Sequence, residues 1–128
     1  MRLTIPTLAV ALGLCAAAPA VAADGKELYL DNCAACHQPT GKGIPGAFPA
    51  LAGSKVAQGD PKEPITRVLK GRGGMPSFSS ELNDLEIAKV LTYARVTWGN
   101  KGKPVQPAQV TALRTGAKGP TTKPALAH

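Results

Sequence analysis

The pentapeptide Cys-Ala-Ala-Cys-His at residues 33–37 places two thiols and an imidazole within five residues. Clusters of this kind serve four chemistries: a disulfide, a zinc site, a redox dithiol and a haem attachment site. Each chemistry requires a different surrounding fold. The rest of the chain therefore has to decide among them.

The first 23 residues have the pattern of a secretory signal peptide. Arg2 supplies a positive charge, residues 3–18 are almost wholly apolar, and small residues follow at 20–22. The apolar run is too short for a membrane span, and no stop-transfer segment follows it. We therefore expect cleavage near Ala22 or Ala23, export to the periplasm, and no membrane span.

The number of cysteines in the mature chain depends on this cleavage. Cys15 could mark a lipoprotein, but the bulky Leu14 precedes it where lipoprotein processing requires a small residue. We expect Cys15 to be lost with the signal. Cys33 and Cys36 are then the two cysteines that remain.

Charge divides the mature chain into two parts. Residues 24–100 carry nine Lys and Arg against eight Asp and Glu, a net charge of +1, whereas residues 101–128 carry five bases, no acid and four prolines. Because it has few large apolar residues to bury, the segment 101–128 is expected to be a largely disordered basic tail, either solvated or a strap along a partner. It has no aromatic residue, so we expect no nucleic-acid binding.

Hydrophobic periodicity predicts an all-α domain at 24–100, without strand-like alternation of useful length. Capping patterns and glycines suggest where each helix begins and ends. We expect three main helices: one from Asp24 through Cys33, one from about residue 60 (or from Pro64) to Gly71, and one from the capping box Asn83–Glu86 to Gly99, with Trp98 on its apolar face.

Two long loops rich in Gly and Pro, at 41–59 and 71–80, separate these helices. Loops of this length in a small domain are usually functional or wrapped around a ligand. A domain of 77 residues is also marginally stable without a covalent or metal staple. We therefore expect a ligand at the centre of the fold.

This setting favours one of the four chemistries. Zinc is disfavoured because it needs four ligands, and beside Cys33, Cys36 and His37 the mature chain offers only the terminal His128 as a soft donor, so the second ligand pair is missing. A thioredoxin-like dithiol needs a βαβ setting, and a disulfide across two residues closes too short a loop to stabilise a domain. Haem c fits, because the two thiols can form thioether bonds, the adjacent imidazole can reach the iron, and the chain is expected to be exported.

Met75 is the candidate for the sixth iron ligand. It is the only methionine left after the signal, and it stands between Gly73, Gly74 and Pro76. A methionine that merely fills the core is the alternative, which a Gly/Pro loop suits less than a helix does. Methionine and histidine are a known axial pair for haem. His128, the competing ligand, lies at the end of the basic tail.

Taken together, these motifs resemble the class I cytochrome c family of bacterial monohaem type. The resemblance covers residues 24 to about 100, and its motifs come in the family's order. They are the first helix leading into CAACH, the P-x-L-x-G segment Pro49–Gly53, MPSF around Met75, and the final helix LNDLEIAKVLTYARVTWGN. This resemblance implies a fold of three main helices with Gly/Pro-rich loops around one covalent haem c.

The resemblance also assigns residues to the site. It implies that the carbonyl of Pro49 accepts a hydrogen bond from the imidazole of His37, and that Leu51 contacts the haem. It further implies that the first and last helices cross at Gly25, Tyr29 and Tyr93. The basic tail has no counterpart in the minimal family domain.

Function follows from the ligation. With His37 and Met75 on the iron, no open position is left for a substrate, so we expect electron transfer and no enzymatic activity. The expected role is a periplasmic carrier between a dehydrogenase or quinol-oxidising complex and a terminal oxidase or reductase, acting as a monomer. The alternative is a tightly bound subunit of an exported quinoprotein or molybdenum dehydrogenase. A haem sensor or peroxidase, in which Met75 dissociates, is a third reading.

Overall fold

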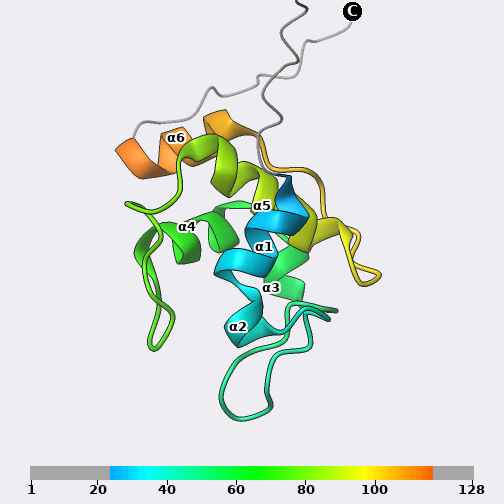
Figure 1. Ribbon diagram of the computed structural model, residues 1–128. Coiled ribbons are helices and arrows are strands. Elements are labelled where there is room, and N and C mark those ends of the chain that lie inside the picture. Colours follow the sequence, from blue (N-terminus) through cyan, green and yellow to red (C-terminus); the bar gives the residue numbers. More distant parts are fainter. Residues whose placement is uncertain (1–23, 117–128) are drawn as a thin grey trace, which may run out of the picture.

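The structure, a computed structural model, describes residues 24–116 (Figure 1). The expected signal peptide at 1–23 and the end of the tail at 117–128, with His128, lie outside the described residues. Residues 24–116 form helices and no strand, which confirms the all-α fold, and no helix in this range is long and apolar enough to cross a membrane. The helices are α1 (Gly25–Asn32), α2 (Ala34–His37), α3 (Lys55–Gln58), α4 (Lys62–Lys70), α5 (Asp84–Val96) and α6 (Pro107–Thr115).

The expected helix starts are confirmed at α1 and α5. The side chain of Asp24 accepts a hydrogen bond from the backbone N–H of Glu27 at 2.8 Å. At α5 the capping box is complete, because the Asn83 side chain accepts from the Glu86 N–H at 2.9 Å and the Glu86 carboxylate accepts from the Asn83 N–H at 2.8 Å. These side chains satisfy backbone donors that a helix start leaves free.

Two expected helix ends are wrong by a few residues. The first helix stops at Asn32, and Cys33 is the joint between α1 and α2. The last helix stops at Val96, because Thr97 takes an extended backbone (ψ 165°) and the next residue, Trp98, takes a positive φ of 55°. Trp98 therefore lies beyond the helix and not on its face.

The first and last helices of the expected domain cross closely, as the resemblance implied (Figure 1). A Cβ on Gly25 would lie 2.3 Å from the carbonyl oxygen of Lys89 on α5, so only glycine allows this approach. Beside the crossing, the ring of Tyr29 lies 5.4 Å from that of Tyr93 and 5.1 Å from that of Trp98, centroid to centroid. These contacts build the core of the domain around the α1–α5 pair.

The expectation of disorder from residue 101 is wrong for residues 101–116. This segment is ordered and ends in α6, which lies along α4 and α5 at the end of the molecule opposite α2 (Figure 1). Val105 and Val110 are buried at 4% and 0% exposure, and Arg114 pairs with Asp84 at 2.6 Å. The prediction failed because the average composition of 101–128 concealed a few apolar residues spaced so that they share one helix face.

Candidate functional site

A cleft of about 200 Å³ brings together five of the six predicted site residues. The sixth, Cys36, is half-buried on α2, three residues after Cys33. Most other lining residues are apolar, and they come from α3, α4, α5 and the segments around Leu51 and after Met75. The predicted residues that line the cleft are Cys33, His37, Pro49, Leu51 and Met75.

These groups fit a covalently bound haem. Cys33 and Cys36 are free thiols, so no disulfide competes for them. The cleft also offers an imidazole and a thioether, which are the two ligand types of a His/Met haem. Its predominantly apolar lining suits the porphyrin ring, since burying an apolar surface is favourable.

His37 is held by a backbone acceptor from a distant loop. Its Nδ1 lies 2.8 Å from the carbonyl oxygen of Pro49, twelve residues along the chain. A carbonyl can only accept, so Nδ1 carries the hydrogen and Nε2 is left with its lone pair. Such a bond fixes the ring orientation and strengthens the imidazole as a metal ligand. The backbone carbonyl of His37 accepts in turn from the Gly43 N–H at 2.9 Å.

Cys33 faces the cleft from the joint between α1 and α2. Burial, with a smaller contribution from nearby Cys36, raises the pKa of the Cys33 thiol to about 11. The thiol is therefore uncharged at neutral pH, and the apolar cleft contains no buried thiolate.

Met75 is held in a tight turn that folds back on the end of α4. Its backbone N–H and carbonyl both pair with Arg72, each at 3.0 Å. Gly71 has a φ of 71°, and a Cβ there would lie 2.5 Å from the Met75 carbonyl oxygen. Beyond Met75, the hydroxyl of Ser77 donates to the Leu69 carbonyl at 2.6 Å. The turn thus fixes the backbone that presents the thioether.

Two polar residues that sequence reasoning missed hold the 51–59 segment beside the cleft. Asn100 is buried and makes three hydrogen bonds, donating to the carbonyls of Leu51 and Ala94 at 2.9 and 2.8 Å and accepting from the Gly53 N–H at 2.8 Å. These bonds join the P-x-L-x-G segment to the end of α5. The other residue is Arg95, four positions after Leu91 on the apolar face of α5. A cation is unusual on such a face, and this is the sequence signal that could have identified it.

Arg95 is 2% exposed and donates only to carbonyl oxygens. Its Nη1 and Nη2 reach Ala57 and Gly59 at 2.9 Å each, and its Nε reaches Lys103 at 2.7 Å. Burial lowers the pKa of Arg95, but an arginine side chain stays protonated at neutral pH. This side chain joins the segment around α3 to the segment leading to α6.

The aromatic cluster of Tyr29, Tyr93 and Trp98 lies beside the cleft, and two of its members bind the chain directly after His37. The Tyr29 hydroxyl donates to the Gln38 carbonyl at 2.7 Å, and the Trp98 indole donates to the Pro39 carbonyl at 3.2 Å. Burial raises the pKa of Tyr29 far above its ordinary value, so this hydroxyl keeps its hydrogen at neutral pH. The backbone that follows the predicted iron ligand is therefore fixed from the α1–α5 core.

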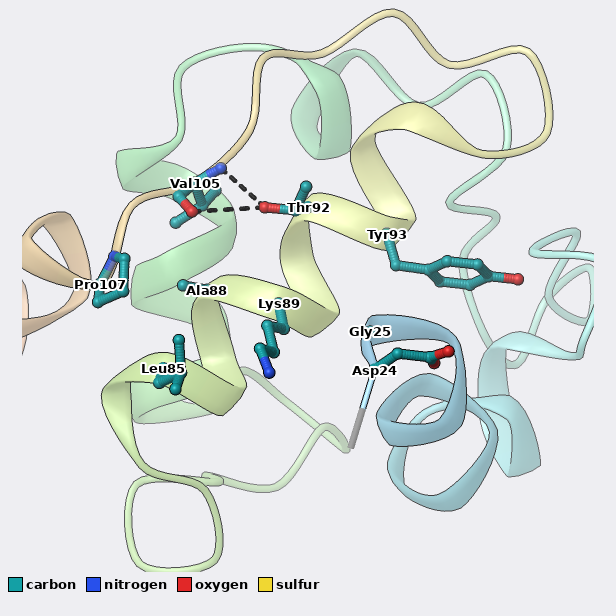
Figure 2. A pocket seen from close by; sticks show the side chains of 9 residues that line it. All are labelled: Asp24, Gly25, Leu85, Ala88, Lys89, Thr92, Tyr93, Val105 and Pro107. Atoms are coloured by element: carbon teal, nitrogen blue, oxygen red, sulfur yellow. Dashed lines mark hydrogen bonds between the residues drawn. The ribbon is translucent and has the colours of Figure 1, made fainter. Parts of the chain in front are cut away.

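A second cavity, of about 430 Å³, lies between the start of α1, α5 and the segment before α6 (Figure 2). On one side the Thr92 hydroxyl accepts from the Val105 N–H at 2.9 Å and donates to the Val105 carbonyl at 3.4 Å. No predicted site residue lines it. The lining residues are Asp24, Gly25, Leu85, Ala88, Lys89, Thr92, Tyr93, Val105 and Pro107.

Comparison of the sequence with known proteins identifies related families and individual relatives. The profile of the family described as cytochrome C oxidase, cbb3-type, subunit III matches residues 20–93. Cytochrome c-552 of Thermus thermophilus is 40% identical over 113 residues, covering 72% of this chain and 85% of that protein. The cytochrome c subunit of the quinone alcohol dehydrogenase of Gluconobacter oxydans is 35% identical over 104 residues, covering 71% of this chain.

The length of the relatives differs. The chain spans only 22% of the Gluconobacter subunit. Among solved structures, the c-type cytochrome KustC0563 has a TM-score of 0.50 at 24% identity, covering 57% of this chain and 95% of that one, which supports the fold. The chain thus belongs to the cytochrome c family, as an electron-transfer protein of class I fold with covalently bound haem c.

Proposed function

We propose that this cytochrome is a periplasmic one-electron carrier whose haem is attached through Cys33 and Cys36 and whose iron is ligated by His37 and Met75. It takes electrons from a dehydrogenase or quinol-oxidising complex and passes them to a terminal oxidase or reductase. One observation carries the proposal: a single cleft contains both Met75 and an imidazole whose Nδ1 is bonded to Pro49.

In this mechanism the bound haem supplies a one-electron couple, and the chain controls the surroundings of that couple. The bond to Pro49 orients His37 and keeps its Nε2 available as a donor. The soft thioether of Met75 favours the ferrous state relative to a second imidazole. If His37 and Met75 both hold the iron, no position would be left on it for oxygen or peroxide. The apolar lining excludes water and limits the rearrangement that accompanies each electron.

The ligand assignment is tested by Met75→Ala and Met75→His. Both variants should attach haem, because the Cys-Ala-Ala-Cys-His motif is intact, and both should have a lower midpoint potential than the wild type. Val96→Ala, which alters a side chain that is 50% exposed and does not line the cleft, serves as the control and should leave the potential unchanged. If both Met75 variants keep the wild-type potential, Met75 is not the ligand. Carbon monoxide binding by the wild-type protein at neutral pH would favour the haem-sensor reading.

A second candidate is a tightly bound electron-transfer subunit of an exported dehydrogenase. The observation in its favour is the similarity to the cytochrome c subunit of the quinone alcohol dehydrogenase. Size-exclusion chromatography of native periplasmic extract, followed by haem absorbance, separates the two candidates. A carrier elutes as a single small domain, whereas a subunit co-elutes with a large dehydrogenase.

The position of α6 limits which truncation can test the basic tail as a strap along a partner. A truncation from residue 102 would remove α6 and the buried Val110, and would therefore damage the fold. A truncation after Gly116 removes only residues 117–128. If the strap lies there, this truncation and added salt should both weaken the complex while the haem spectrum stays the same. Insensitivity to both changes would exclude a strap within residues 117–128.

A further inference from the structure

Arg114, on α6, binds the part of the chain that runs from Met75 to the start of α5. Its Nε pairs with the carboxylate of Asp84 at 2.6 Å. Its Nη1 donates to the Ser79 carbonyl, and its Nη2 donates to the Leu82 carbonyl at 2.9 Å. All three acceptors belong to residues 79–84, which lie 30 to 35 positions before Arg114 in the sequence. One side chain of α6 therefore holds the backbone on both sides of Leu82.

The segment 75–82 forms one wall of the haem cleft. Met75, Phe78 and Leu82 all line the cleft, and Leu82 is only 6% exposed. The distance along the chain is short, because Ser79 follows Met75 by four residues. A displacement of Ser79 or Leu82 would therefore move the backbone that presents the thioether of Met75.

Two helices hold the segment 75–82 in place. Its first half is bound to α4, because the Ser77 hydroxyl donates to the Leu69 carbonyl at 2.6 Å and the Phe78 N–H donates to the Val68 carbonyl at 2.8 Å. Its second half is bound to α6 through the guanidinium of Arg114. Loss of this guanidinium would leave the second half with fewer bonds to the rest of the fold, while the bonds to α4 stay intact.

The carboxylate of Asp84 is prepared for this pair. Hydrogen bonds from Thr111 and from Arg114 lower the pKa of Asp84, so the carboxylate is charged at neutral pH. Both donors belong to α6, and each binds a different oxygen of the carboxylate. Bonds between a guanidinium and a carboxylate are stronger than bonds between neutral groups.

We propose that Arg114 is a positioning residue for the methionine ligand, and that it acts by opposing the opening of the segment 75–82. This inference rests on the proposed function, because it requires Met75 on the iron. The soft thioether favours the ferrous state, so its bond to ferric iron is the weaker one. For the thioether to leave ferric iron, Met75 must move away with its backbone. The bonds of Arg114 resist that movement and so stabilise the ligated form.

Loss of Arg114 should make replacement of Met75 by an external ligand easier. Imidazole can bind the ferric iron only after the thioether has left, so its apparent affinity depends on the fraction of molecules in which the segment is open. Arg114→Gln should raise this affinity roughly tenfold, which corresponds to about 1.4 kcal/mol less stabilisation of the closed segment. The effect is set below the full strength of three charge-assisted bonds, because the side chains of Arg114 and Asp84 are 28% and 27% exposed.

The test is titration of the ferric holoprotein with imidazole at neutral pH, followed by the charge-transfer absorption band of iron bound to a thioether sulfur. Arg114→Lys keeps the charge but cannot reproduce the three-pronged contact of the guanidinium, so it should give a smaller increase in affinity. Lys101→Gln is the matched charge control, since it removes one positive charge from an exposed position in the same segment.

Gly25→Ala is the control for overall stability. Its added Cβ meets the Lys89 carbonyl and weakens the α1–α5 crossing. The crossing is the same whether the segment 75–82 is open or closed, so this variant should bind imidazole as the wild type does. A readout that does not depend on the iron is amide hydrogen exchange at Leu82, whose N–H donates to the Phe78 carbonyl at 3.0 Å. This amide should exchange faster in Arg114→Gln and at the wild-type rate in Lys101→Gln.

The proposal is overturned if Arg114→Gln binds imidazole no better than Lys101→Gln. It is also overturned if Gly25→Ala reproduces the increase, because the effect would then follow from lower overall stability. If Arg114→Gln does not accumulate as holoprotein, Asp84→Asn decides: it removes the carboxylate partner of Arg114, and wild-type affinity in this variant would overturn the proposal. Failure of the proposed function is separate, because the wild type would then lack the thioether band and Met75→Ala would bind imidazole no better than the wild type.

Discussion

Asn100 is expected to be the most sensitive polar position outside the iron site. Its side chain makes three hydrogen bonds to backbone groups, and the residue is only 6% exposed. Asn100→Ala leaves the Gly53 N–H and the carbonyls of Leu51 and Ala94 without this partner. An orphaned buried group costs about 1–3 kcal/mol. Because the segment around Leu51 is partly exposed and water can reach some of these groups, we expect a total loss of about 2–4 kcal/mol.

The assay is guanidinium denaturation of the holoprotein at pH 7, followed by haem absorbance and by far-ultraviolet circular dichroism. Asn32→Ala is the matched control, because Asn32 is half-buried and makes a single side-chain hydrogen bond, to the Leu28 carbonyl at 2.9 Å. Asn32→Ala should cost no more than about 1 kcal/mol. The Gly53 amide should also exchange with solvent faster in Asn100→Ala. Equal losses in the two variants, with unchanged exchange at Gly53, would refute the reasoning.

Asn100→Asp separates the three bonds further. The carboxylate keeps an acceptor for the Gly53 N–H but faces the carbonyls of Leu51 and Ala94 with negative charge, so its native pKa should be raised. A carboxyl group with a raised native pKa destabilises the fold as the pH rises through its titration. Asn100→Asp should therefore be more stable at pH 4 than at pH 7, relative to the wild type. A stability difference that does not change with pH would contradict this.

Two further predictions concern the helix contacts. Gly25→Ala should lower stability by roughly 1–3 kcal/mol, because the added Cβ meets the Lys89 carbonyl of α5. Gly74→Ala is the control, since a Cβ there meets nothing within 4 Å. Thermal melting of the two variants measures the difference. Asp84→Asn removes the contacts with Thr111 and Arg114 that lower the pKa of Asp84. Its cost, on the order of 1 kcal/mol, should be present at pH 7 and should disappear as the pH falls below the ordinary Asp pKa of 3.8 through the lowered native value; denaturation at several pH values measures it.

Sequence reasoning succeeded where the determinants are local. The capping bonds of Asp24 and of the Asn83–Glu86 pair join residues only three apart in the sequence, so each pattern predicted the start of its helix. The bond between His37 and Pro49 spans twelve residues and was anticipated only through the resemblance to a family. The iron ligation itself stays a prediction that the Met75 variants test.

Sequence reasoning failed where the determinants are distant or were averaged away. The bonds from Arg95 to the segment around α3 span more than thirty residues, and no periodicity in one helix reveals them. For α6 the signals were local but overlooked. Pro107 stands at its start, Val110 and Leu113 share one face, and Gly116 in a left-handed conformation ends it. Counting charges over 101–128 hid this pattern, because most of the positive charge belongs to residues that flank the helix or follow it.

The packing of α6 against the domain bears on the choice between a diffusing carrier and a tightly bound subunit. The Nε of Arg95 is bound to the Lys103 carbonyl, while its other nitrogens hold Ala57 and Gly59 beside the cleft. Residues 101–116 do not line the cleft themselves, but Arg95 joins them to a segment that does, so releasing them to wrap a partner would free one of the three bonds that hold Arg95. A binding partner that displaced α6 should alter the midpoint potential as well as the affinity. A partner that leaves the potential unchanged must dock elsewhere, which is the behaviour expected of a diffusing carrier.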